Sequence, residues 1–241
     1  MATAAIIQKV IREPLTLAGR TYLTNVEQFA AMMAMMSRAM LSRLAEPAIG
    51  TQTTSRQAKT LPSLRTASDP SFLHLCYVVM LVTFGEAFLH DGLAECALAD
   101  RSIMGNSEQR ASYSEVVALG TFEAVERELR SRWARNFVDD GGPKRWIARL
   151  SKMFGGEYPA DLVVQMEEAW GVRHMVVHHA GVATADFVMR HPRLTGVAGQ
   201  RLSLPLQLVL DYAEAIGRFV RVTDNAVGRR IKGNTPKSTK F

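Results

Sequence analysis

The feature that most restricts the fold is a long segment, residues 71–99, that is apolar on nearly every side when drawn as a helix. Such a helix must be surrounded, either by other helices or by lipid. Its 72–89 part has the length of a membrane span, but it carries His74 and Glu86. Because polar and charged side chains are costly inside a bilayer, we expect the segment to be the buried central helix of a helical protein.

Helical periodicity covers most of the remaining chain, and no stretch shows the sustained alternation of a strand. We therefore predict an all-α fold, a helical bundle. The further helices are expected at residues 3–12, 22–45, 112–138, 143–154, 159–180 and 205–231. Pro14 and Gly19 separate the first two, and Ser112 with Glu115 has the spacing of a capping box.

Changes in composition divide the chain into four parts. Residues 1–46 form an N-terminal helical extension. Residues 47–69 are rich in Thr, Ser and Gln and are weakly basic, which predicts a flexible linker. Residues 70–231 form the main helical domain, and residues 232–241 form a polar, basic tail.

Charge and cysteine content narrow the class of protein. Lys and Arg number 29 against 23 Asp and Glu, a net charge of +6, which favours a polyanion such as nucleic acid as partner. Cys76 and Cys96 have the spacing of neither a zinc site nor a disulfide framework. The first residues lack the pattern of a signal peptide, so we expect a cytoplasmic protein without a membrane anchor.

The most informative motif lies near the end of the helix expected at 159–180. At roughly 100° per residue, Arg173 interrupts an apolar stripe formed with Leu162, Met166, Ala169, Val177 and Ala180. A buried guanidinium needs a partner or a ligand, because an unpaired buried charge costs several kcal/mol.

A second face of this helix carries Glu167, Gly171, His174 and His178, and Gly171 would let another helix come close. On an ideal helix Arg173 and His178 point roughly 140° apart. They converge only if the helix deforms near its end or if two copies of the chain meet across a two-fold axis.

The motif resembles the signature of the HEPN superfamily, in which an Arg precedes a His near the end of a helix. The match runs through Arg173, Val177, His178 and Gly181. The stretch from Phe84 to Leu89, with Glu86 between two phenylalanines, is similar to an acidic element that such domains carry upstream. His174 and His179 stand where the family often has Asn. The resemblance covers about residues 70–230.

The resemblance implies a homodimeric endoribonuclease that needs no metal or other cofactor. Arg173 and His178 are its expected catalytic residues, together with His174 and Glu86. In the expected reaction the RNA 2′-hydroxyl attacks the adjacent phosphorus, His178 moves protons and Arg173 stabilises the phosphate charge. Branches of the family from toxin and abortive-infection systems imply a toxin-like or defence-associated protein, with an antitoxin or defence-system partner.

Two other functions fit the same residues. A HEPN-type fold can serve as a non-catalytic module that binds protein or nucleotide, in which Arg173 pairs with an acid such as Glu86. The His174 and His178 pair has the i, i+4 spacing of a helical zinc site, with His179 and His191 as further ligands.

Three other groups of residues allow two interpretations each. Glu86 and His90, one turn apart, form a buried pair, or else Glu86 orients the site. The basic residues between 127 and 152 follow an RNA backbone or form a salt-bridged, solvated face. The methionines between 32 and 40 are expected to fill the core, the other interpretation being an adaptable binding surface.

Overall fold

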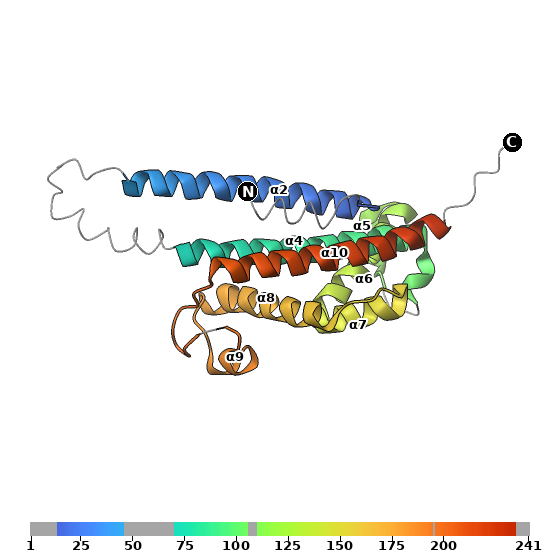
Figure 1. Cartoon of the computed structure of the whole chain (residues 1–241). Helices are drawn as coiled ribbons and strands as arrows, with labels where there is room; N and C mark the ends of the chain where they lie inside the picture. The colour runs from blue at the N-terminus through green and yellow to red at the C-terminus, as the bar shows by residue number, and fades with distance from the viewer. Residues whose placement is uncertain (1–13, 46–69, 106–109, 195, 235–241) are drawn as a thin grey trace.

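The computed structural model describes residues 14–45, 70–105, 110–194 and 196–234. Within these residues the chain forms eight α-helices, one short 3-10 helix and no strand, which confirms the predicted all-α class. The elements are α2 (Leu17–Ala45), α4 (Pro70–Ala99), η2 (Arg101–Met104), α5 (Tyr113–Leu119), α6 (Phe122–Asp139), α7 (Pro143–Phe154), α8 (Ala160–His179), α9 (Ala185–Arg190) and α10 (Leu206–Asn234) (Figure 1).

α4 is the central helix, as its sequence predicts. It contacts α2, α6, α8 and α10, and it runs lengthwise between its neighbours in Figure 1. Its side chains Leu75, Val78, Leu81, Val82, Leu89 and Leu93 are almost fully buried. By length and composition Phe72–Ala99 is the one segment of the described residues that could cross a membrane, and 44% of its most apolar part is buried within the protein.

α2 belongs to the same core as α4, through Ala18, Tyr22, Val26 and Phe29. Two carboxylates hold its first turn. Asp224 of α10, which is 2% exposed, accepts hydrogen bonds from the backbone N–H groups of Leu15 and Thr16 and from the Thr16 hydroxyl. Glu95 of α4 accepts the N–H of Leu17 at 3.1 Å. These acids satisfy N–H groups at the positive end of the helix, so α2 is fixed to both long helices.

Two expectations about α2 are wrong. The helix does not start after a break at Gly19 but begins at Leu17 and continues through Gly19. A Cβ at that position would clash with the carboxylate of Asp224, so glycine is what lets the capping acid approach. The methionines Met32, Met35 and Met36 are exposed, whereas Met33 packs partly against the core.

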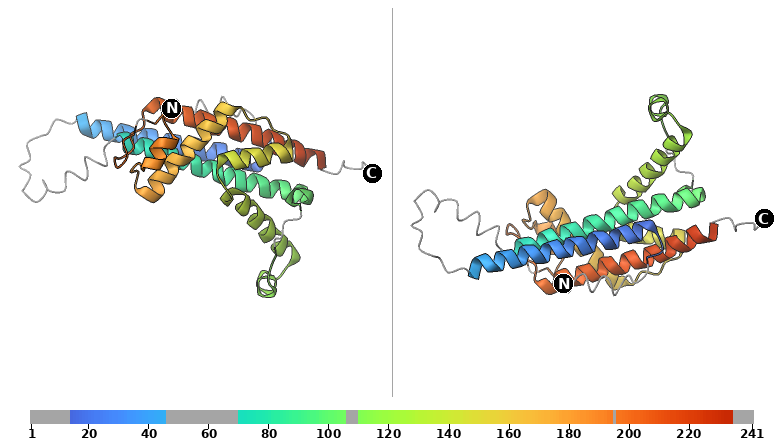
Figure 2. Two further views of the ribbon diagram at one scale, coloured as in Figure 1. Left: turned by 90° about the horizontal axis from the view of Figure 1, so that it is seen from below. Right: turned by 90° about the horizontal axis from the view of Figure 1, so that it is seen from above.

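The helix expected at 112–138 is two helices, α5 and α6. The capping box of Ser112 and Glu115 is present and opens α5. Gly120, with a φ of 72°, ends α5 in the left-handed region that glycine adopts with little strain. Thr121 then caps α6 by accepting the N–H of Ala124. Figure 2 shows α5 and the first part of α6 projecting from the bundle.

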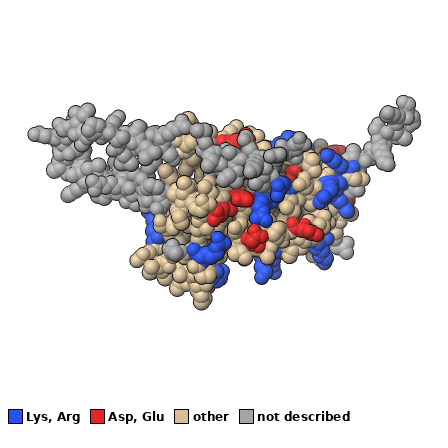
Figure 3. All heavy atoms as spheres, viewed as in Figure 1, with Lys and Arg blue, Asp and Glu red and all other residues tan. Residues whose placement is uncertain are grey.

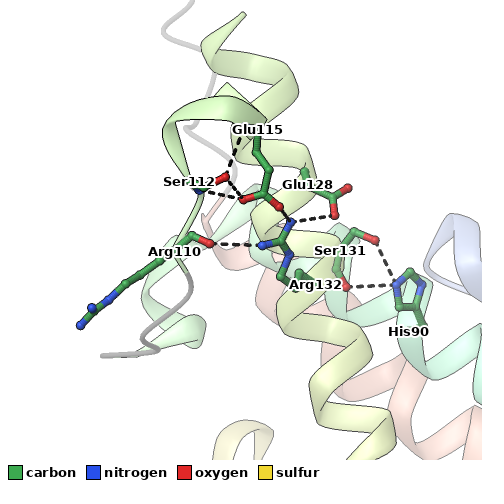
Figure 4. A network of polar contacts seen from close by, with 7 residues as sticks. All are labelled: His90, Arg110, Ser112, Glu115, Glu128, Ser131 and Arg132. Atoms are coloured by element: carbon green, nitrogen blue, oxygen red, sulfur yellow. Dashed lines mark hydrogen bonds and ion pairs between the residues drawn. The ribbon is translucent and has the colours of Figure 1, made fainter. Parts of the chain in front are cut away.

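Arg132 of α6 holds α5 in this projecting position (Figure 4). Its guanidinium lies 2.9 Å from Glu115 and 3.3 Å from Glu128, and it donates to the carbonyl of Arg110 at 3.2 Å. The hydrogen bonds of Arg132 with both acids raise its pKa. The α5–α6 arm is therefore joined by a charged network.

The remaining boundaries follow the sequence closely, with two exceptions. Residues 143–154 form α7 as expected, and the motif helix is α8. The segment after α8, expected to be a loop, contains α9, which Thr184 caps. The closing helix α10 extends to Asn234, three residues past its expected end at 231. The helix expected at 3–12 and the linker at 47–69 lie outside the described residues, as does the tail from 235 on.

Candidate functional site

The motif lies on α8, and the face of this helix that is buried changes gradually along its length. Leu162, Met166 and Ala169 are fully buried, as the expected stripe requires. Beyond Ala169 the buried positions advance in steps of three residues to Val172 and Met175. The extension of the stripe to Val177 is therefore wrong, because that side chain is 52% exposed. Arg173 lies at the edge of the stripe and is half-buried.

Arg173 pairs with Glu86 of α4 across the interface between α8 and α4. The two side chains lie 3.3 Å apart and are 28% and 21% exposed, so Glu86 lies within reach of the motif helix, as expected. Burial raises the pKa of Glu86, the Arg173 charge opposes this shift, and Asp139 adds to it. The Arg173 Nε atom is buried and has no hydrogen-bond partner among the described residues, so this guanidinium retains donor capacity.

A cavity of about 600 Å³ opens beside this ion pair. Its charged and aromatic lining residues are Glu86, His90, Arg135, Asp139, Trp146, Trp170 and Arg173. His90 contacts Asp91 at 2.8 Å, and no hydrogen bond or ion pair joins it to Glu86 within the described residues. It also contacts the Ser131 carbonyl at 3.2 Å (Figure 4). The interpretation of Glu86 and His90 as a buried pair is therefore wrong, whereas the other interpretation, that Glu86 orients the site, stays a prediction.

Three exposed histidines gather at the end of α8. The ring centroid of His174 lies 4.6 Å from that of His178 and 5.8 Å from that of His179. Partial burial lowers the pKa of His174, and the charges of His178, His179 and Arg173 lower it further, which favours a neutral imidazole at neutral pH. Within the described ranges no group of three or more His, Cys, Asp or Glu side chains is arranged to hold a metal ion.

The candidate residues form two separate pairs in one chain. Arg173 turns towards α4 and Glu86, whereas His174 and His178 lie next to each other, with tilted rings, on the exposed side of α8. In the described part of the chain, no hydrogen bond or ion pair joins Arg173 to His178. This divergence agrees with the roughly 140° separation on an ideal helix.

The close approach expected at Gly171 occurs within the chain. A Cβ at Gly171 would lie 2.8 Å from His191 Nε2 and 3.1 Å from Phe187 Cε2. Phe187 belongs to α9, and His191 directly follows that helix. Gly171 is thus explained by the packing of α9 on α8.

The basic region around α6 and α7 is partly neutralised by acids, which pair with four of its eight basic side chains. Arg130 lies 3.1 Å from Glu126, Arg145 lies 2.7 Å from Asp140, and Arg149 lies 3.4 Å from the same carboxyl group. Figure 3 shows acidic and basic side chains interspersed on the face that it presents. These contacts favour the salt-bridged, solvated face over a continuous track for an RNA backbone.

Sequence reasoning missed a second buried carboxyl group, that of Glu168 on α8. It is 3% exposed and lies near Arg193 and Tyr212. Burial raises its pKa, while Arg193 and the Tyr212 hydroxyl oppose that shift. The spacing along the helix could have indicated this burial, because Glu168 lies on the same helix face as the apolar residues Val172 and Met175.

We compared the chain with protein-family models, with curated proteins and with solved structures, and none of these comparisons finds a match. The functional argument therefore rests on the motif of α8 and on the geometry around it.

Proposed function

We propose that the protein is a metal-independent endoribonuclease of HEPN type. The observation that carries the proposal is a half-buried guanidinium, Arg173, on the same helix end as three exposed histidines. Cleavage of RNA by its own 2′-hydroxyl needs two kinds of group, a proton carrier and a cation for the phosphate oxygens. The net charge of +6 suits a polyanionic substrate. We further propose a toxin-like or defence-associated role in the cytoplasm.

The proposed reaction assigns one task to each residue. A bond forms between the 2′-oxygen and the phosphorus while the bond from phosphorus to the 5′-oxygen breaks. His174, held neutral by its lowered pKa, accepts the 2′-hydroxyl proton, and His178 returns a proton to the 5′-oxygen. Arg173 stabilises the charge on the nonbridging oxygens, and Glu86 positions Arg173.

The proposal includes a homodimer, because Arg173 and His178 do not meet within one chain. An isologous contact between two copies of the α8 end would place the Arg173 of one copy near the histidines of the other. Sedimentation of the purified chain at micromolar concentration tests this part. A monomer at that concentration would contradict the composite site.

One observation favours a second function, that of a non-catalytic helical module. Glu86 already neutralises Arg173 and holds it against α4. In that case the ion pair joins α8 to α4, and the exposed ends of α8 and α9 contact another protein. The two functions differ in whether the histidines are needed for any chemistry.

RNA cleavage separates the two functions. The full chain is incubated with structured and unstructured RNA in EDTA, and the fragment ends are analysed. Transesterification leaves a 2′,3′-cyclic phosphate and a 5′-hydroxyl, because the attacking oxygen belongs to the RNA. Arg173→Ala and His178→Ala should each lower cleavage by about 10² or more, with unchanged helical content.

His179→Ala is the matched control, since His179 lies on the same exposed helix end but has no task in the reaction. It should retain most of the activity. Cleavage that requires an added metal, or that persists in both Arg173→Ala and His178→Ala, would contradict the mechanism. Intact RNA in every reaction would favour the non-catalytic module.

A further inference from the structure

A second cavity, larger than the one beside Arg173, shares Trp170 with it and has no task in the reaction above. It measures about 870 Å³ and is bounded by α8, the start of α7, and α9 with the residues that follow it. This volume is in the range of sites for small molecules of nucleotide size. His174 is one of its lining residues, so the cavity adjoins the proposed proton carriers.

The buried carboxylate of Glu168 gives the cavity its strongest acceptor. Arg193 Nη1 lies 3.6 Å from Glu168 Oε2, and the Tyr212 hydroxyl donates to that same oxygen at 3.5 Å. Both distances exceed the roughly 2.7–2.9 Å of a charge-assisted hydrogen bond. Neither of these two contacts involves the other oxygen, Oε1. An ionised carboxylate accepts about four hydrogen bonds, so Glu168 can receive donors from a ligand.

The rim of the cavity is cationic. Lys144, Arg190 and Arg193 are exposed there. Asp186 pairs with Arg190, and Arg193 lies beside Glu168, so Lys144 is the rim cation whose side chain has no acid partner within the described ranges. The other lining acid, Glu167, accepts the backbone N–H of Lys144 at 3.0 Å and so caps the start of α7. Lys144 and the exposed Arg193 favour an anionic group at this rim over a cationic one such as an arginine or lysine side chain. The ligand that fits therefore combines a neutral edge of N–H donors with an anionic group.

The walls of the cavity are apolar and aromatic. Trp170 and Phe187 line it, together with valine, proline and methionine side chains. Trp146 packs edge-on against Trp170 with ring centroids 4.5 Å apart, which fixes the orientation of that indole. Aromatic side chains of this kind commonly stack on unpaired bases. The ligand should therefore contain a flat ring.

We propose that this cavity binds a guanine nucleotide through Glu168. Guanine alone among the common bases presents two neighbouring donors, N1–H and the N2 amino group, which match the two oxygens of a carboxylate. Adenine and cytosine place an acceptor beside their amino group, and uracil places its one N–H between two carbonyls. The phosphate then lies at the cationic rim. The source is a free nucleotide or an unpaired guanosine of RNA, and the latter rests on the proposed ribonuclease activity.

Nucleotide binding to the full chain tests the inference without any catalysis. Titration calorimetry and the change in tryptophan fluorescence, to which Trp170 contributes, are followed with GMP, IMP, AMP and UMP. GMP should bind with a Kd below about 1 mM, and IMP, which lacks only the N2 amino group, should bind about tenfold more weakly. AMP and UMP should bind more weakly still. Equal affinities for all four, or no binding of GMP at several millimolar, would overturn the inference.

The variant Glu168→Gln keeps the shape of the side chain but replaces one acceptor oxygen with a donor. It should lower GMP affinity about tenfold or more and remove the preference over IMP. Glu123→Gln, an exposed acid on α6 away from the cavity, is the matched control and should bind GMP as the parent does. The comparison of GMP with IMP on the parent chain gives the same information if Glu168→Gln unfolds.

The combination of binding and cleavage results distinguishes the inference from the proposed function. GMP binding without RNA cleavage supports the guanine site and removes the ribonuclease. If the parent cleaves RNA at guanosines and Glu168→Gln cleaves without this preference, both the guanine site and the ribonuclease are supported. Cleavage without GMP binding and without a preference for guanosine overturns the guanine site alone. Tighter binding of L-arginine amide than of GMP would also overturn it, in favour of a basic peptide.

Discussion

Replacement of Gly171 by alanine measures how closely α9 packs on α8. The added Cβ would lie 2.8 Å from His191 Nε2 and 3.1 Å from Phe187 Cε2. Phe187 is 2% exposed, so it has little room to move. Gly92→Ala, within α4, is the matched control, because its Cβ would meet only Ala18 at an ordinary 3.7 Å.

Both substitutions replace glycine inside a helix, which by itself stabilises the fold by about 1 kcal/mol. Gly92→Ala should therefore raise the free energy of unfolding by about 0.5–1 kcal/mol. At Gly171 the crowding of two neighbours adds a cost of about 1–3 kcal/mol. The two variants should therefore differ by about 1–3 kcal/mol. In a chain of this size each kcal/mol shifts Tm by roughly 2–4 °C.

Thermal unfolding of the parent and both variants, followed by circular dichroism, gives this difference directly. The same samples are examined by sedimentation. If Gly171→Ala raises Tm as much as Gly92→Ala does, α9 does not pack on α8 as described. If Gly171→Ala dissociates a dimer that the parent forms, the close neighbour of Gly171 is a second copy of the chain, and our explanation of this glycine is refuted.

Two other perturbations follow from buried carboxyl groups. Asp224→Asn should lower the free energy of unfolding by about 3 kcal/mol, measured in urea, because Asp224 accepts three hydrogen bonds at the start of α2; a change below about 0.5 kcal/mol would show that this cap is dispensable. Glu86 has a pKa raised above its ordinary value of 4.5, chiefly by burial. The stability that its proton contributes is therefore fully present below that value and is lost as pH rises through the raised pKa. Urea unfolding measured at a series of pH values should show this loss of stability in the parent. In Arg173→Gln the loss should occur at higher pH, because the opposing charge is removed, and in Glu86→Gln it should be absent. An unshifted profile in Arg173→Gln would show that the ion pair is absent in solution.

Most helices could be predicted because their signals are local. The capping box at Ser112 and Pro143 at the start of α7 each act within a few residues, and the apolar length of α4 is read along one continuous segment. The errors arise where a distant group decides. Gly19 continues α2 because Asp224, far along the chain, caps the helix start, and α9 forms where it can pack against Gly171.

The candidate site was predicted in part. The contact of Glu86 with Arg173 was expected from the sequence motif, and the separation of Arg173 from His178 follows from helix geometry. The cavity beside His174 could not be predicted, because α7, α8 and α9 meet there only after folding. In the sequence Glu168 resembles an ordinary surface acid, and its burial follows only from the change of the buried face along α8.

The sequence by itself determined the helical class, the central place of α4 and the motif of α8, since periodicity and capping depend on neighbours in the chain. Only the tertiary structure decided which charges are buried and which of them meet. Arg173 is paired with Glu86, Glu168 faces a cavity and Asp224 caps α2, because each of these contacts joins residues more than twenty positions apart or depends on how helices pack. Burial of a charge is a property of that packing, and it is what gives these carboxyl groups their chemistry.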